Sequence, residues 1–217
     1  RFGYTKTIDV SAFETTKEAV LTENKFVFTC KNTGKICIFT NTGQLHTVKV
    51  MDIPYGKFRD KGVPIDNISN FDGGKESVIA AYSQMSLNLY RIIFITRQAM
   101  MKVVSGGEFD VSKRTVAATK LMEEDEVVNV AVLENQQQIV LKTREGYFLK
   151  FDLEEIPEKK KNAVGVRGMK LTGNDCVESV YYTQSNFETQ IPYGERMISL
   201  DKLKTAKRDG RGTKLKL

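Results

Sequence analysis

The chain has 217 residues, of which 41% are hydrophobic and 28% are charged, and its net charge is +6. This balance is ordinary for a globular protein with a hydrophobic core. No apolar stretch approaches the roughly 18 residues of a membrane helix, and no signal-peptide pattern is present, so we expect no membrane partner. Because the chain begins with Arg1, we expect it to be a fragment of a longer protein.

The positive charge is concentrated in four segments rather than spread over the chain. These segments are 57–61, 113–120, 159–170 and 202–216, and the remainder is acidic overall. A solvated surface mixes charges of both signs, whereas clustered cations indicate a polyanionic partner.

The three cysteines, Cys30, Cys37 and Cys176, lack the spacing of metal ligands. An odd and sparse set of cysteines fits a reducing cytoplasm, where we expect them to act as small apolar core residues.

One pattern recurs along the chain. Residues 36–43, 92–99 and 139–146 each give a short apolar run, then Thr, then a polar turn. Divergent copies of the turn lie at 2–4 and 193–195. A period of about 40 to 56 residues is typical of propellers and arrays of small sheets.

Each repeat predicts four short strands. The first strand ends before a turn, at 26–30, 78–82, 127–133 and 177–182. The second strand is the apolar run described above. The third strand follows the polar turn, at 45–50, 100–104 and 147–151. Ile36 and Ile38 alternate with Cys37 and Phe39, so both faces of the second strand are apolar, as in a strand between neighbouring sheets. A long polar connection carries the basic cluster and ends in a short apolar stretch, at 64–68, 118–121, 168–171 and 212–215. Residues 105–117 and 184–190 read as loops.

The expected fold is therefore all-β and propeller-like, with about five four-stranded blades and almost no helix. The approximate blades are 1–34, 35–86, 87–136, 137–184 and 185–217, in one domain over residues 1–217. The first blade is expected to be incomplete, because it lacks the strand before its turn and has only a thin connection over 12–19.

The segment 206–212, Ala-Lys-Arg-Asp-Gly-Arg-Gly, carries the most chemistry. Glycines let a backbone bend tightly and approach a phosphate chain, while guanidinium groups bind phosphate oxygens. Weaker versions lie at 57–62, 113–114 and 161–168, in the same place in successive repeats. We expect phosphate contacts from Lys57, Arg59, Lys61, Lys113, Arg114, Lys159, Lys160, Lys161, Arg167, Lys207, Arg208, Gly210, Arg211, Gly212 and Lys214.

This chain resembles the C-terminal β-pinwheel domain of bacterial type IIA topoisomerase A subunits, which are gyrase A and its topoisomerase IV counterpart. The resemblance rests on Phe2-Gly3-Tyr4-Thr5-Lys6, the Ile-Phe-Thr-Asn-Thr-Gly strand and turn, residues 159–171, and the terminal segment 206–212. The gyrase box usually reads Gln-Arg-Arg-Gly-Gly-Arg-Gly and lies in the first blade. Here Ala206 and Asp209 depart from it, the match lies in the last blade, and residues 11–17 hold no box.

The resemblance implies a non-catalytic domain that binds and bends double-stranded DNA, largely independently of sequence, and presents it to a cleavage core for strand passage. The displaced box favours a topoisomerase IV-like protein, with gyrase A as the alternative. The resemblance also implies a cytoplasmic, nucleoid-associated protein. Its implied partners are the ATPase B subunit of the enzyme and the catalytic core of its own polypeptide. No cofactor is expected in this fragment, and ATP and Mg²⁺ are expected to bind elsewhere in the parent enzyme.

Catalysis by the chain itself is not expected. None of the eight tyrosines lies beside an arginine in a helical context, as the cleaving tyrosine of this family does. The single histidine, His46, is expected to be a structural or surface residue. The acidic run 123–126 lacks the spacing of a metal loop and is expected to be a solvated turn. A Walker-type loop is also missing from the sequence.

Two alternatives remain from the sequence. A protein-interaction propeller would also use basic loops, although the chain has no tryptophan and lacks the Gly-His and Trp-Asp signatures. A propeller hydrolase or lyase would require an acid/base constellation that the sequence does not offer.

Overall fold

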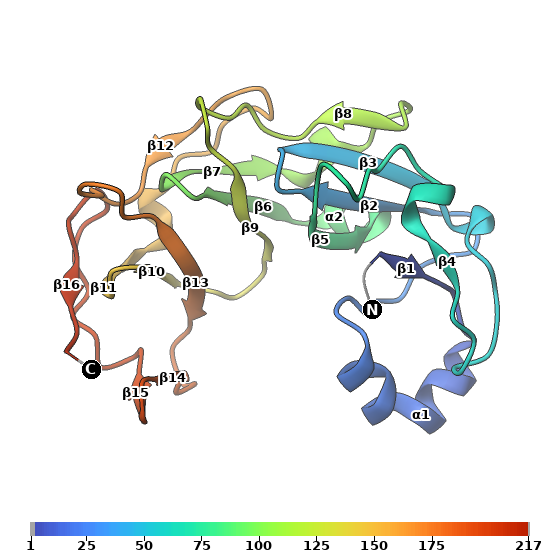
Figure 1. Cartoon of the computed structure of the whole chain (residues 1–217), viewed down its shortest axis with the longest axis horizontal. Helices are drawn as coiled ribbons and strands as arrows, with labels where there is room; N and C mark the ends of the chain where they lie inside the picture. The colour runs from blue at the N-terminus through green and yellow to red at the C-terminus, as the bar shows by residue number, and fades with distance from the viewer. Residues whose placement is uncertain (1–2, 217) are drawn as a thin grey trace. The chain divides into compact units, whose positions relative to one another are not determined.

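The computed structural model describes residues 3–216, so the prediction on Phe2 falls outside it. The chain forms two compact units (Figure 1). Unit 1 comprises Arg1–Leu89 and Gly106–Ala118, and unit 2 comprises Tyr90–Ser105 and Thr119–Leu217. Within residues 3–216, no helix combines the length and the apolar character needed to cross a membrane.

Unit 1 contains one four-stranded antiparallel sheet and one two-stranded sheet. The larger sheet has the order β5 (Val78–Ser83), β2 (Lys35–Thr40), β3 (Gln44–Lys49) and β8 (Thr115–Ala117). The smaller pairs β1 (Tyr4–Thr5) with β4 (Val63–Pro64). Short helical turns η1 (Val50–Asp52), η2 (Ile65–Asn67) and η3 (Gly106–Phe109), with helix α2 (Gln84–Leu89), connect these strands.

Both faces of β2 are buried, as its alternation predicts. Ile36 and Ile38 pack in a core with Val48, and on the other face the Phe39 ring meets Phe109 edge-on at 5.2 Å between centroids. Cys37 Sγ lies 3.1 Å from Gln84 Oε1 on that same side. Successive apolar residues of β2 therefore pack into two different layers, one on each face of the sheet.

The sequence missed helix α1 (Val10–Glu23), which occupies the stretch predicted as a thin connection. Asp9 caps it by accepting a hydrogen bond from the Ser11 N–H at 2.9 Å. The helix is kinked at Thr16, and Val20 is its only buried residue. The helical period was hidden because the helix buries so little that its apolar residues form no regular stripe.

The predicted strand at 26–30 is wrong. These residues form no regular element, and Val27 and Phe28 are exposed. The equivalent segments of other repeats each pair with a turn-bearing strand of their own repeat, as β5 pairs with β2. Within residues 3–216, segment 26–30 pairs with no strand.

Unit 2 contains two four-stranded sheets and one hairpin. The first sheet has the order β12 (Val166–Arg167), β7 (Met100–Ser105), β6 (Arg91–Thr96) and β9 (Val127–Leu133). The second has β13 (Val177–Thr183), β10 (Gln138–Thr143), β11 (Tyr147–Asp152) and β16 (Thr213–Lys214). The hairpin joins β14 (Gln190–Tyr193) to β15 (Arg196–Ser199), and η4 (Leu153–Glu155) follows β11.

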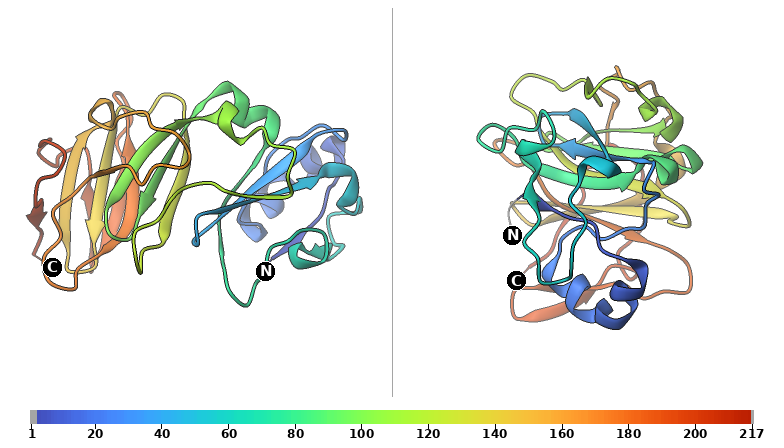
Figure 2. Two further views of the ribbon diagram at one scale, coloured as in Figure 1. Left: turned by 90° about the horizontal axis from the view of Figure 1, so that it is seen from above. Right: turned by 90° about the vertical axis from the view of Figure 1, so that its right-hand side faces the viewer.

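The sheets of unit 2 stack in layers (Figure 2). Ile139, Leu141 and Phe151 pack against residues of β6 and β7 on one face. On the opposite face Val140 and Phe148 pack against Ile191 and Leu200, from β14 and the end of β15. The central sheet is thus covered on both faces, which explains its near-continuous apolar strands.

The all-β class and the repeated four-stranded sheets are confirmed by this topology. In each four-stranded sheet the fourth strand comes from the following repeat, so that β8, β12 and β16 pair with β3, β7 and β11. The two end sheets, β1–β4 and β14–β15, have two strands each among the described residues. The first blade is incomplete, as predicted, but the last sheet has two strands where four were expected.

Candidate nucleic-acid interface

The pairing register places the four basic segments at one structural position. We call residues 57–62, 110–114, 159–165 and 206–212 the basic loops; each ends directly before an edge strand, at β4, β8, β12 and β16 respectively. The registers Thr5↔Val63, Leu45↔Val116, Met101↔Val166 and Phe148↔Thr213 are equivalent. The recurrence predicted from sequence is therefore a recurrence in structure, at the edge of a sheet.

Three of the basic loops end at a position that only glycine can occupy. Gly62, Gly165 and Gly212 have φ of 79°, 102° and 78°, and a Cβ on each would lie 2.3–2.6 Å from a carbonyl oxygen of the partner strand. These glycines let the loop turn tightly onto the sheet edge. Loop 110–114 is followed instead by Thr115, so it enters its strand without this turn.

In unit 2 the basic loop 206–212 contacts the segment 167–170, at the end of β12 and just after it. Arg167, just after loop 159–165, donates from Nε to Asp209 Oδ1 at 2.5 Å and from Nη2 to Oδ2 at 3.1 Å. The Asp209 and Lys170 N–H groups donate to Gly168 and Gly210 carbonyls at 2.7 and 2.9 Å. These contacts hold Arg167 and Lys170 next to the terminal basic loop within the unit.

The Arg167–Asp209 pair shifts both ionisation equilibria. The Arg167 hydrogen bonds hold the pKa of Asp209 below its ordinary value, and Asp209 in turn raises the pKa of Arg167. Asp209 therefore carries a full negative charge at neutral pH, next to the cations of its own loop.

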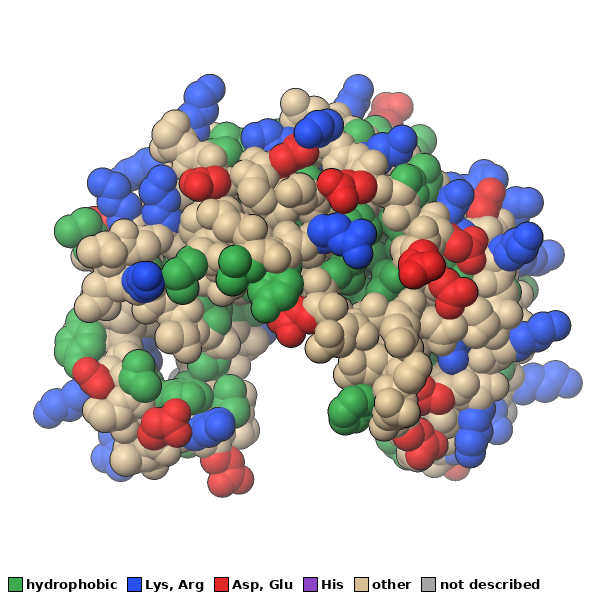
Figure 3. Space-filling view, turned by 180° about the vertical axis from the view of Figure 1, so that it is seen from behind, with side chains coloured by type: hydrophobic (Ala, Val, Ile, Leu, Met, Phe, Trp, Pro, Cys, Tyr) green, Lys and Arg blue, Asp and Glu red, His purple; other side chains and the backbone are tan. Residues whose placement is uncertain are grey.

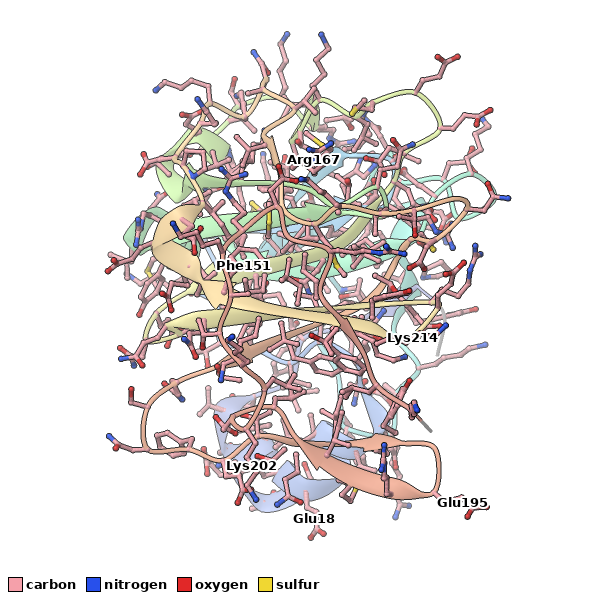
Figure 4. The ribbon with its side chains drawn as sticks, turned by 90° about the vertical axis from the view of Figure 1, so that its left-hand side faces the viewer. Glu18, Phe151, Arg167, Glu195, Lys202 and Lys214 are labelled. Atoms are coloured by element: carbon pink, nitrogen blue, oxygen red, sulfur yellow. The ribbon has the colours of Figure 1, made fainter. Side chains whose placement is uncertain are left out.

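Most of the predicted site residues are exposed, as Figure 3 shows for the lysines and arginines of each unit. Figure 4 places Arg167 and Lys214 at the surface of unit 2, apart from Lys202 and from buried Phe151. The exposed cations among the predicted contacts are Lys57, Arg59, Lys61, Lys113, Arg114, Lys159, Lys160, Arg167, Lys207, Arg211 and Lys214.

Arg208 and Lys161 are the half-buried members of the predicted set. The Arg208 guanidinium donates to the carbonyl of Glu155 at 3.0 Å and to that of Arg167 at 2.6 Å. Its side chain is thus bound within the protein, where it ties loop 206–212 to η4 and to the preceding basic loop.

Aromatic rings lie beneath several of the exposed cations. Arg211 and Lys214 lie 5.5 and 5.4 Å from the centre of the Tyr147 ring, and Lys61 lies 4.6 Å from that of Tyr4. Tyr4 and Tyr147 each follow a glycine with positive φ, Gly3 and Gly146. Each such contact favours one arrangement of a flexible cation by about 0.5–1 kcal/mol. Sequence reasoning missed this role, although the recurrence of Tyr one residue after the turn glycine was its signal.

Two lysines beneath the basic loops were also missed. Lys6 and Lys102 direct their ammonium groups at backbone carbonyls of loops 57–62 and 159–165. For Lys102 the available signal was a lysine in an otherwise apolar strand, because a buried ammonium must find acceptors.

His46 is a structural residue, one of the two roles predicted for it, because only 3% of its surface is exposed. Its Nδ1 lies 2.9 Å from Thr115 Oγ1 and its Nε2 lies 2.7 Å from Glu76 Oε1. Burial alone would raise the pKa of Glu76, but hydrogen bonds from Thr40 and the Asp72 N–H, with the His46 charge, lower it on balance. This network fixes the end of loop 110–114.

Elsewhere the ionisable groups also have structural roles. In the acidic run, Asp125 accepts from the Gln98 N–H at 2.9 Å, and Glu126 pairs with Arg97. Within residues 3–216, no group of three or more His, Cys, Asp and Glu side chains is placed to hold a metal ion. Cys37 is buried in the core, which with the Asp110 charge raises its pKa to about 12.

Comparison with known proteins agrees with this geometry. The family described as DNA gyrase C-terminal domain, beta-propeller, matches residues 90–134 and 137–183. The gyrase A protein of Lawsonia intracellularis is 32% identical over 204 residues, covering 88% of this chain and 24% of that protein. The chain thus spans about a quarter of the length of the curated relatives it matches.

Solved structures share the fold. The C-terminal domain of DNA topoisomerase IV superposes with a TM-score of 0.80 at 24% identity, covering 97% of this chain and 69% of that one. The E. coli ParC C-terminal domain gives 0.71 at 18% identity, covering 86% and 78%. Together with the family match and the gyrase A relatives, these show that the chain is a homologue of the C-terminal β-pinwheel domains of type IIA DNA topoisomerase A subunits.

Proposed function

We propose that this chain binds double-stranded DNA along the basic edges of its sheets, largely without sequence preference, and bends the duplex. The single observation that supports this most is the equivalent register of four basic loops, each placed directly before an edge strand. Exposed lysines and arginines on these loops would contact phosphates. The loops present no helix that could enter the major groove to read bases.

Bending the duplex costs free energy that DNA binding must supply. Curving a duplex over a short site costs on the order of 1–6 kcal/mol, and many phosphate contacts must offset it. Each contact releases condensed counterions, so the logarithm of affinity falls with the logarithm of salt concentration by about 0.9 per phosphate neutralised. A strong salt dependence is therefore the signature of this function.

The test removes the exposed cations of the terminal loop and strand. Changing Lys207, Arg211 and Lys214 together to Ala should lower the salt slope by about three, near one per contact. Binding to a random-sequence duplex would be measured by fluorescence anisotropy over a range of salt. Arg208 is left in place because its guanidinium holds the loop rather than facing solvent.

The matched control removes three exposed lysines of unit 1 outside the basic loops, Lys17, Lys25 and Lys31. This control should change the slope by much less than three, although it removes the same charge. An unchanged slope in the Lys207, Arg211 and Lys214 variant, with folding intact by circular dichroism, would exclude the terminal loop from the DNA path.

We propose further that residues 1–217 form one β-pinwheel domain of a larger topoisomerase polypeptide. In this proposal, strand cleavage belongs to the catalytic core of the same polypeptide, ATP and Mg²⁺ bind elsewhere in the enzyme, and the ATPase B subunit is a partner. A cytoplasmic, nucleoid-associated location follows from DNA as the substrate.

Two members of the family remain candidates. A topoisomerase IV-like role is favoured by the first repeat, where residues 11–17 lie in helix α1 and form no box. A gyrase A role is favoured by the gyrase A identity of the curated relatives. Nicked circles relaxed with the protein and then ligated would separate them: a linking-number shift of fixed sign supports chiral, gyrase-type wrapping, and its absence at saturation supports binding without it.

A further inference from the structure

Lys102 lies directly beneath the basic loop 159–165. It is the third residue of β7, and none of its surface is exposed. Its Nζ donates to the carbonyl oxygens of Lys160, Lys161 and Ala163, at 3.1, 2.6 and 2.6 Å. A buried ammonium with these acceptors cannot itself reach a ligand, so any effect of Lys102 on binding acts through the loop.

Lys6 repeats this arrangement in unit 1. Its Nζ donates to the carbonyl oxygens of Lys57, Phe58 and Asp60, with distances of 3.5 Å to Lys57 and 2.5 Å to Asp60. The acceptors stand at the same offsets before β4 as those of Lys102 stand before β12. Both loops also contain the same internal hydrogen bond, Asp60 N–H to Lys57 and Ala163 N–H to Lys160, each 3.0 Å.

The direction of these carbonyls determines what the loop presents outward. In a trans peptide the C=O and the following N–H point in opposite directions, and no described peptide bond is cis. When Lys102 turns the three carbonyls toward itself, the N–H groups of Lys161, Asn162 and Val164 point away from it. For Lys6 the corresponding N–H groups belong to Phe58, Arg59 and Lys61.

We propose that Lys6 and Lys102 are positioning residues that make the outer faces of these loops into phosphodiester-binding surfaces of backbone N–H groups. Each lysine withdraws three carbonyl oxygens that would repel a phosphate and leaves N–H donors beside the loop's own exposed cations. Backbone donors carry no base preference, which suits contacts to the sugar–phosphate chain. This inference rests on the proposed function and assigns the groups that contact DNA.

Loop 206–212 is supported differently and serves as an internal comparison. Leu149 occupies the position of Lys102, with its Cδ1 against Gly210, and the Gly210 carbonyl accepts from the Lys170 N–H. The carbonyls of this loop therefore have no lysine beneath them, and its DNA contacts should depend on side chains alone.

The first test uses the isotope-labelled full chain and a short duplex of mixed sequence. We expect the amide resonances of Lys161, Asn162 and Val164 to shift strongly when the duplex is added, as should those of Phe58, Arg59 and Lys61. Amides of the loop 184–190, which holds no lysine or arginine, serve as the control. Saturable binding without shifts at these six amides would overturn the inference.

The second test compares Lys102→Met with Lys49→Met, which removes one exposed lysine from the corresponding hairpin strand β3. Lys102→Met should weaken duplex binding about fivefold more than Lys49→Met, since hydrogen bonds to a charged group are lost. The salt slope should stay at the wild-type value, because no phosphate-contacting side chain is removed. Lys159→Ala, by contrast, should lower the slope by about one.

The outcomes separate this inference from the proposed function. Equal binding by Lys102→Met and Lys49→Met would overturn the inference while leaving DNA binding intact. Failure of the wild-type chain to bind the duplex would contradict both. If Lys102→Met does not fold by circular dichroism, the wild-type amide shifts and the equivalent Lys6→Met variant decide the question.

Discussion

Asp209 is one of two residues, with Ala206, at which segment 206–212 departs from the gyrase box that it resembles. It stands where the family carries glycine, it has a positive φ of 66°, and it neutralises Arg167 through two hydrogen bonds. An acid among these cations lowers the local positive charge, and its pairing with Arg167 ties the loop 206–212 to β12. Sequence alone identified the departure, but the partner of the carboxylate could be found only from the folded loops.

Replacing Asp209 by Asn should tighten duplex binding. Asn keeps the shape of the side chain and tolerates the left-handed backbone, while the change removes one negative charge and releases Arg167. We expect the salt slope to increase by about one, equivalent to one added phosphate contact. Anisotropy titrations over a salt series check this, with Glu195→Gln, an exposed acid of the β14–β15 turn, as the matched control. Weaker binding by Asp209→Asn would show instead that the pair is needed to shape the loops.

At the scale of elements, the edge strands and the turns before them determine where the cations lie. β4, β12 and β16 are each only two residues long. Each follows a glycine whose backbone lies too close to a carbonyl of the partner strand for a Cβ to fit, and this close approach fixes the end of the basic loop. The hairpin strands β6, β7, β10 and β11 could be predicted because their apolar alternation is a local property. The edge strands were predicted only in part: the stretches 64–68 and 212–215 overlap β4 and β16, whereas β8 lies within 105–117, which was predicted as a loop, and β12 ends before the stretch 168–171. Their exact positions depend on pairing with a strand from the preceding repeat.

The change Gly212→Ala should destabilise the fold at this junction. A Cβ there would lie 2.6 Å from the Phe148 oxygen and 2.9 Å from Met169 Cε, on a backbone with φ of 78°. Strain of this kind costs about 1–3 kcal/mol. Urea unfolding would measure it, with Gly210→Ala as the control, because that Cβ has its nearest contacts at 3.2 and 3.3 Å. Equal unfolding midpoints for the two variants would contradict the assigned role of Gly212.

At the scale of the whole molecule, stability rests on apolar cores completed by a few buried polar networks. In unit 1 the network of His46, Glu76 and Thr115 joins β3 to the segment before β5 and to β8. The isolation of His46 in the sequence predicted a structural or surface residue, but it gave no indication of Glu76, which lies 30 residues further along the chain.

The pKa of Glu76 predicts how stability depends on pH. Its pKa in the folded protein lies below the ordinary value of 4.5, so its contribution is present above that value and is lost as pH falls through the folded pKa. Glu76→Gln should therefore lower the free energy of unfolding at pH 7, and the difference from wild type should shrink as the pH falls below about 4.5. Urea unfolding at several pH values measures this, with exposed Glu14→Gln as control. A difference independent of pH would contradict the assignment.

The sequence by itself determined the all-β repeat, the hairpins and the clustering of cations, because alternation, turn residues and charge are properties of neighbouring residues. Only the tertiary structure decided which cations remain exposed, since Arg208, Lys6 and Lys102 are bound by carbonyls from distant segments. It also decided that 10–23 is a helix and that 26–30 is not a strand. Strand pairing and the satisfaction of buried charge depend on partners far along the chain, and a local pattern does not contain them.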